Sequence, residues 1–217
     1  MAAPVVDILM YHSISDDGGA TSITVADFRM QMAAIAAAGV PVISLDDYLD
    51  GRAGKRVLAP RSVILTFDDG FQDFADQAWP VMQARGYRPI VYLPTAHVGR
   101  REDWALCHPT PRRIMDWPLI RALAADGVSF GSHTVSHPRL TELSPEVMEV
   151  EIAAAKVRLE VILERKVPHF AAPFKPNRGP LPFAFLIGPN IPAGGIRPRD
   201  QRAINRRTRR SDWRAHR

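Results

Sequence analysis

Two adjacent carboxylates, Asp68 and Asp69, directly follow the apolar run at residues 62–67 and precede Gly70. Such a run is typical of a strand buried on both faces, and α/β proteins place their chemistry at the carboxyl ends of such strands. Neighbouring carboxylates repel each other and are costly to desolvate. The pair therefore indicates a cation site or a proton-transfer task, whereas a solvated Asp-Asp-Gly turn is the alternative from this stretch alone.

Two histidines, His133 and His137, follow a second apolar segment at residues 128–130. Gly131 before them and Pro138 after them favour a strand-to-turn setting over one helical face. Imidazole nitrogen and carboxylate oxygen together suit zinc or a similar divalent metal that keeps an open position for water. The histidine pair is weak evidence alone, but together with the two carboxylates it indicates a functional site.

Four motifs in this order resemble the polysaccharide deacetylase family, the NodB-homology domains. Thr-Phe-Asp-Asp-Gly at residues 66–70 and His-Thr-Val-Ser-His at 133–137 are similar to the family's first two motifs. Ile-Leu-Met-Tyr-His at 8–12 agrees further, and Phe-Ala-Ala-Pro-Phe at 170–174 is similar to the third motif. The resemblance covers residues 7–174 and does not extend beyond them.

The resemblance implies a ligand set and a general base. Asp69, His133 and His137 would hold a divalent metal, and Asp68 would be the general base. Zinc is the expected ion, with cobalt, nickel and iron as alternatives. In this scheme the metal polarises the substrate amide and lowers the pKa of its water, and the neighbouring carboxylate removes the proton.

The resemblance also implies two catalytic contributions outside the ligand set. The backbone N–H of Phe174 is the family's candidate donor to the oxyanion. The C-terminal histidine that serves as general acid in much of the family has no match, so we expect His12 to cover part of that role. Ala171 and Ala172 stand where an arginine or tyrosine is common, which affects how the base is oriented.

Strand and helix patterns alternate along the chain. This alternation predicts an α/β fold with a mostly parallel sheet, and the resemblance implies a distorted (β/α) barrel with fewer than eight strands. Because six strands leave such a barrel short of closure, we expect it to be incomplete at its C-terminus. The expected strands lie at residues 7–12, 41–45, 62–67, 89–93, 128–131 and 167–174, and the expected helices begin near residues 24, 45, 74, 116 and 144.

The last predicted helix begins at Ser144 and runs for about twenty residues. We expect its inward face to be the apolar stripe formed by Val147, Val150, Ala154, Val157 and Val161. Residues 94–115 show no clean periodicity. They predict a long loop with a short helix at the rim of the site, including Trp104, Cys107 and His108.

Composition favours one domain and gives no sign of nucleic-acid binding by the globular part. The chain has 217 residues, 46% hydrophobic content and a formal net charge of +5. Residues 175–217 hold eleven Arg or Lys and two Asp, a net charge of +9, so residues 1–174 carry −4. The first residues show no secretion signal and no stretch is long enough to span a membrane, so the expected location is the cytoplasm, with a cell-envelope role as the alternative.

Residues 175–217 break the preceding patterns. They contain six prolines and lack amphipathic periodicity. One hypothesis is a basic, disordered tail, and the other, which we favour, is a reading-frame shift just after Phe174. The predicted domains are therefore an incomplete catalytic domain at 1–174 and a separate segment at 175–217.

The leading functional hypothesis is a metal-dependent hydrolase. It would remove N-acetyl groups from amino-sugar polymers such as peptidoglycan, chitin-like chains or exopolysaccharide. Hydrolysis of small cyclic amides or ureides on the same fold is the alternative. An inactive metal-binding fragment and a module that binds through its basic tail are the alternatives from other classes.

Overall fold

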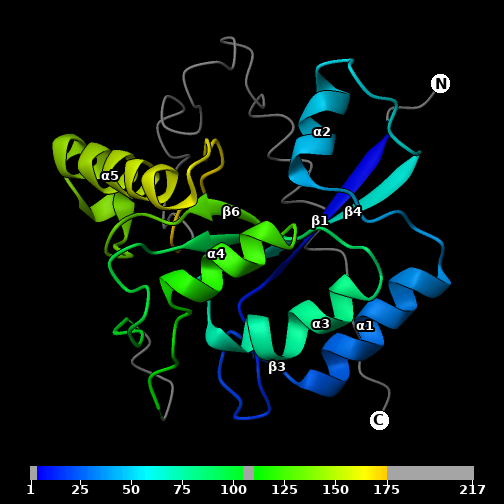
Figure 1. Cartoon of the computed structure of the whole chain (residues 1–217), viewed down its shortest axis with the longest axis horizontal. Helices are drawn as coiled ribbons and strands as arrows, with labels where there is room; N and C mark the ends of the chain where they lie inside the picture. The colour runs from blue at the N-terminus through cyan, green and yellow to red at the C-terminus, as the bar shows by residue number, and fades with distance from the viewer. Residues whose placement is uncertain (1–3, 105–109, 175–217) are drawn as a thin grey trace. The chain divides into compact units, whose positions relative to one another are not determined.

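The computed structural model describes residues 4–104 and 110–174. Its main sheet contains four parallel strands in the order β1-β4-β5-β6 (Figure 1). The parallel α/β prediction is confirmed. The predictions for Cys107, His108 and residues 175–217 lie outside the described residues. The strands are β1 (Val5–Tyr11), β4 (Arg61–Phe67), β5 (Ile90–Leu93) and β6 (Ser129–Ser132).

Helices alternate with these strands, and four of them begin after a capping side chain near the predicted start. The side chains of Thr24, Ser44, Asp116 and Ser144 each accept a backbone N–H from the first turn of the helix that follows. No helix in the described ranges is long and apolar enough to cross a membrane. The elements are α1 (Val25–Ala37), α2 (Leu45–Arg52), the π-helix η1 (Phe74–Ala78), α3 (Trp79–Gln83), α4 (Trp117–Ala125), the 3-10 helix η2 (Leu140–Glu142) and α5 (Pro145–Leu163), with two-residue strands β2 (Ser13–Ile14) and β3 (Ser22–Ile23).

Two predicted strands are reduced to single bridges. The strand expected at residues 41–45 pairs only through Val42 with Val63, because the chain turns at Ser44 to begin α2 with a capping box. The strand expected at 167–174 pairs only through Phe170 with Ser132. Its two prolines lack the N–H groups that a longer ladder requires. Both segments nevertheless lie beside the sheet where the sequence predicted them.

The helix expected near residue 74 begins as a π-helix. Over Phe74–Ala78 the helix is wider than an α-helix, and the N–H of Trp79 bonds to the carbonyl of Phe74. Pro80 follows within α3, where it has no N–H to donate. The wider turn therefore directly precedes the proline.

The short helix predicted within residues 94–115 is wrong for the part that the structure describes. Residues 94–104 and 110–115 form turns and isolated antiparallel bridges, including one between Arg101 and Arg113. The buried Glu102 carboxylate holds this segment together, because Arg112 Nε lies 2.6 Å from Glu102 Oε1. A long-range ion pair thus takes the place of local helical hydrogen bonds.

An aromatic cluster fixes the carboxyl ends of β1 and β4. Tyr11 packs against Phe28 and Phe67 at ring-centroid distances of 5.4 and 5.2 Å, and Phe67 contacts Phe74 at 4.8 Å. Buried aromatic pairs contribute about 0.5–1.5 kcal/mol each beyond their area burial. His12 and Asp68 directly follow the two strands whose ends this cluster packs together.

A pair of side chains joins α2 to the segment after α5. His169 Nε2 lies 2.8 Å from Asp46 Oδ1, across 123 positions of the sequence. The hydrogen bond from His169 lowers the pKa of the Asp46 carboxyl, although partial burial opposes the shift. The carboxylate is largely exposed, so solvent screens the pair and its contribution to stability is small.

The inward face predicted for α5 is wrong. Val147, Val150, Val157 and Val161 are exposed, at 50–70% of their full surface. The buried face is instead formed by Met148, Ala155, Leu159 and Leu163. Both stripes recur at helical spacing, so periodicity alone did not distinguish them. Figure 1 shows α5 beside α4 and β6, which are the elements that its buried face contacts.

We predict that truncation to alanine separates the two faces of α5. Leu159→Ala should lower the free energy of unfolding by about 2–5 kcal/mol, because it creates a cavity in the core. Val150→Ala should change it by less than about 0.5 kcal/mol, because an exposed valine loses little burial and alanine favours helix. Urea denaturation of both variants measures the difference, and equal losses would contradict the assignment of the faces.

Candidate metal centre

The turn after β4 sets the directions of the two carboxylates. The strand ends at Phe67, and both Asp69 and Gly70 have left-handed backbone angles, with φ of 71° and 67°. A Cβ on Gly70 would lie 2.3 Å from Leu93 Cδ2, so glycine is needed for space as well as for conformation. The chain therefore bends at this glycine, and Asp68 and Asp69 are not related by simple strand alternation.

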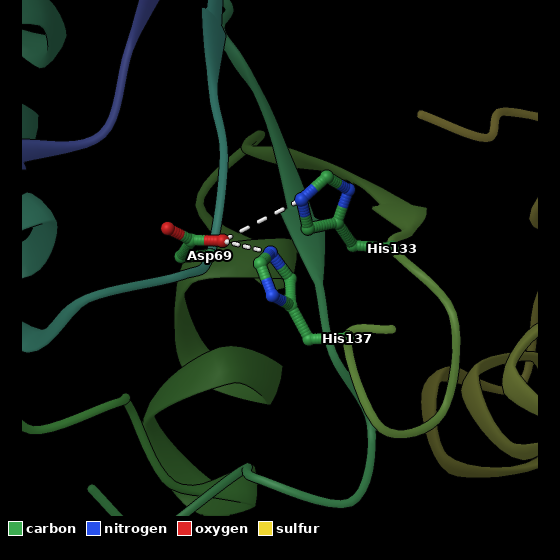
Figure 2. Close-up of side chains that lie close together, drawn as sticks. All are labelled: Asp69, His133 and His137. Atoms are coloured by element: carbon green, nitrogen blue, oxygen red, sulfur yellow. Dashed lines mark ion pairs between the residues drawn. The ribbon is translucent and has the colours of Figure 1, made fainter. Parts of the chain in front are cut away.

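Asp69, His133 and His137 converge on one point although they come from different segments. Their potential ligand atoms all lie within 4.8 Å of one another. His137 Nε2 is 3.0 Å and His133 Nε2 is 3.5 Å from Asp69 Oδ1, and Figure 2 shows both rings directed at that oxygen. All three side chains are buried. The fold therefore brings together the three residues that the resemblance implied as ligands.

The geometry of this cluster suits an ion better than hydrogen bonds. Asp69 Oδ1 is buried and, within the described part of the chain, has no hydrogen-bond partner despite the two nearby imidazole nitrogens. An unpaired buried carboxylate oxygen is costly. Two neutral imidazoles and one carboxylate are a common ligand set for zinc and similar divalent ions. The donor set thus fits a divalent metal.

A backbone carbonyl determines which nitrogen His133 presents to the cluster. His133 Nδ1 lies 2.9 Å from the carbonyl oxygen of Ala171, so Nδ1 carries the proton and Nε2 is left for an ion. Sequence reasoning missed this contact. Because Ala171 acts through its carbonyl, its side chain offers no signal, and only the bridge beside β6 places the carbonyl near the ring.

The two carboxyl groups differ in their electrostatic environments. Burial raises the pKa of Asp68, and the imidazoles of His133 and His12 oppose that shift only in part. Burial also tends to raise the pKa of Asp69, but contacts with His133 and His137 outweigh it and hold the pKa well below its usual range. Asp69 is therefore the persistently anionic member. The raised pKa of Asp68 is the property expected of a group that exchanges a proton.

The remaining predicted site residues lie around the cluster. His12 Nε2 is 4.0 Å from Asp68 Oδ2, at the end of β1. Phe174 has a left-handed backbone with φ of 56°, and its half-exposed ring packs edge-on against His137 at a centroid distance of 4.9 Å. The roles assigned to these residues stay predictions.

Trp104 also contacts one of the predicted ligands. Its ring stacks on His137 at a centroid distance of 3.9 Å and an interplanar angle of 26°. The sequence placed Trp104 at the rim of the site but gave it no role. The contact packs the ring of one predicted ligand beneath an indole.

The family model described as polysaccharide deacetylase matches residues 55–177. The chain belongs to the polysaccharide deacetylase family. This match includes the carboxylate pair, both histidines and Phe174. The family that the motifs resembled is thereby confirmed.

Two relatives share parts of the sequence. The chain is 26% identical over 149 residues to YxkH of Bacillus subtilis, which is named as a proposed polysaccharide deacetylase. It is 28% identical over 89 residues to the poly-β-1,6-N-acetyl-D-glucosamine N-deacetylase of Escherichia coli. The matched regions are 69% and 40% of this chain, but they span only 49% and 13% of the two relatives.

Two solved structures confirm the fold. IcaB from Ammonifex degensii matches with a TM-score of 0.70 at 23% identity, over 81% of this chain and 77% of that protein. The deacetylase PplD of Streptococcus pyogenes, solved with acetate, matches with a TM-score of 0.66 at 24% identity, over 79% and 75% of the two chains. The predicted α/β fold of the NodB-homology type is therefore correct.

We predict that the two carboxylates can be separated by mutation. Asp69→Asn should weaken zinc binding strongly, because a neutral amide oxygen replaces the anionic group that both imidazoles face. Asp68→Asn should retain the metal but lower turnover on the order of 10²- to 10⁴-fold, as expected for a lost general base. Metal content and hydrolysis rate are measured for both variants. Loss of metal only in Asp68→Asn would reverse the assignment.

Proposed function

We propose that this chain is a metal-dependent hydrolase that removes N-acetyl groups from amino-sugar polymers. The observation that carries the proposal is the buried convergence of Asp69, His133 and His137 on one point, with Asp68 beside them. Membership of the polysaccharide deacetylase family supports an N-deacetylase in particular. The E. coli relative named for poly-β-1,6-N-acetyl-D-glucosamine supports an amino-sugar polymer as substrate.

Zinc is the ion that we propose for the site. An ion held by Asp69, His133 and His137 would supply Lewis acidity to the amide carbonyl and would lower the pKa of a water. The protein provides the proton acceptor beside it. Asp68 is buried next to the ligands, and its raised pKa suits it to take a proton from the attacking water.

His12 and Phe174 complete the proposed machinery. His12 lies 4.0 Å from the Asp68 carboxylate, within reach of the same small region, and it would donate a proton to the leaving amine. The backbone N–H of Phe174 would donate to the oxyanion. The ring of Phe174 packs against His137, which brings this residue close to the ligands.

The domain division is also a proposal. Residues 1–174 would form the catalytic domain without its C-terminal part, and residues 175–217 would make no contribution to the metal site. Support for the catalytic domain is that Asp69, His133 and His137, the metal-ligating group found among the described residues, lie within residues 1–174.

The test uses the full chain loaded with Zn²⁺ or Co²⁺. We expect it to release acetate from β-1,6-linked N-acetylglucosamine oligomers and to generate one free amine per acetate. Asp69→Asn is the control, because it removes a proposed ligand while keeping the size of the side chain. Enzymatic assay of acetate and a fluorescent amine label give two independent measurements.

Three other outcomes would each contradict the proposal. Turnover of a cyclic imide without acetate release would favour the small-amide alternative. Metal binding without hydrolysis of either substrate would indicate an inactive fragment. Failure of the wild-type chain to bind any divalent ion would contradict the metallohydrolase assignment itself.

We predict that His12→Ala changes one limb of the pH–rate profile. If His12 is the proton donor, the variant should lose the basic limb, while the acidic limb, which reports the ionised base Asp68, should remain. Because burial raises the pKa of Asp68, activity should fall as pH decreases through that raised value. Retention of both limbs in His12→Ala would remove His12 from the role.

A further inference from the structure

The loop that carries His137 has a backbone that its own residues do not favour. Thr134 and His137 both have left-handed backbone angles, with φ of 71° and 58°. Such conformations are uncommon for residues other than glycine, and they are unfavourable unless surrounding contacts enforce them. Interactions from outside the loop must therefore hold it in shape.

Backbone hydrogen bonds from the segment after β5 hold one side of the loop. Thr95 and Ala96 donate their N–H groups to the carbonyls of Thr134 and Val135, at 3.1 and 2.9 Å. Within the loop, Thr134 Oγ1 accepts the N–H of His137 at 3.0 Å. These bonds do not involve the N–H groups of Val135 and Ser136, which lie between the two histidines in the sequence. Those two groups therefore need other acceptors.

Glu151 supplies those acceptors from α5. Its Oε2 accepts the N–H groups of Val135 and Ser136 at 2.8 and 2.9 Å, and its Oε1 accepts the Ser136 hydroxyl at 2.6 Å. Bonds to a carboxylate are short and about twice as strong as those between neutral groups. One side chain thus fixes both central residues of the loop.

We propose that Glu151 is a positioning residue for the metal ligand His137. By holding Val135 and Ser136 against α5, it keeps His137 Nε2 3.0 Å from Asp69 Oδ1. Glu151 touches neither metal nor substrate. The inference rests on the proposed metal site and adds to it a residue from a different element, 14 positions after His137 in the sequence.

The alternative role for Glu151 is to anchor α5 without any effect on the metal. Glu160 provides a matched control for that role, because it lies on the same helix and accepts the backbone N–H of Val167 at 3.0 Å. Glu160→Ala thus removes the same kind of bond outside the loop. A merely structural role predicts the same metal affinity for both alanine variants.

The experiment measures Zn²⁺ and Co²⁺ affinity by chelator competition in wild type, Glu151→Ala, Glu151→Gln and Glu160→Ala. We expect Glu151→Ala to weaken binding by about 10–100-fold, the usual loss when a group that orients a ligand is removed. Glu151→Gln should lose less, because its amide oxygen still accepts hydrogen bonds. Glu160→Ala should bind as wild type does. The Co²⁺ absorption spectrum should change only in the Glu151 variants.

Wild-type affinity and an unchanged Co²⁺ spectrum in Glu151→Ala would overturn the proposal. If Glu151→Ala does not fold, Glu151→Gln is compared with the wild type and with Glu160→Ala in the same way. Failure of the wild-type chain to bind metal would instead contradict the proposed function. In that case, amide hydrogen exchange at Val135 and Ser136 in the metal-free protein still tests Glu151, since exchange should accelerate on the order of tenfold in Glu151→Gln. Unchanged exchange there would overturn the inference.

Discussion

The site depends on the burial of two adjacent carboxylates at the end of one strand. Asp68 and Asp69 are 8% and 3% exposed, so solvent relieves little of their mutual repulsion. The two imidazoles that face Asp69 offset part of this repulsion, and a bound cation would offset much more of it. The same arrangement makes the carboxyls unequal, because the imidazoles stabilise the charge of Asp69 whereas burial dominates at Asp68. This difference suits Asp69 to the proposed role of metal ligand and Asp68 to the proposed role of proton acceptor.

The positions of the imidazoles depend in turn on groups that carry little sequence signal. The Ala171 carbonyl selects the proton position on His133, and the Thr134 hydroxyl and the Glu151 carboxylate hold the loop of His137. The Ala171 and Glu151 contacts join different elements, and the Thr134 contact holds a loop with left-handed backbone angles. The site therefore tolerates little change in how β6, α5 and the segment after α5 pack. Below the site, the aromatic layer around Phe67 keeps the ends of β1 and β4 in place.

Large apolar side chains remain exposed in several parts of the described fold. Ile8 and Met10 on β1 and the valine stripe of α5 are accessible to solvent. β1 has no further strand on its outer side within the described ranges, and the segment beside β6 pairs through a single bridge. A sheet with such edges has unpaired N–H and C=O groups. The matched part of this chain spans about half the length of YxkH.

The sequence by itself determined the parallel α/β architecture and the helix starts, because alternating apolar runs and capping side chains are local patterns. The four motifs are local too, and they named the six residues that stay proposed for the site. The sequence did not determine the buried face of α5, since two apolar stripes have the same spacing and only packing against α4 and β6 selects Leu159 over Val157. It also failed at residues 41–45 and 167–174, where a cap and two prolines limit pairing to single bridges. Only the tertiary structure decided that Ala171, Trp104 and Glu151 contact the histidines or their loop, because those contacts join residues that are distant in the chain.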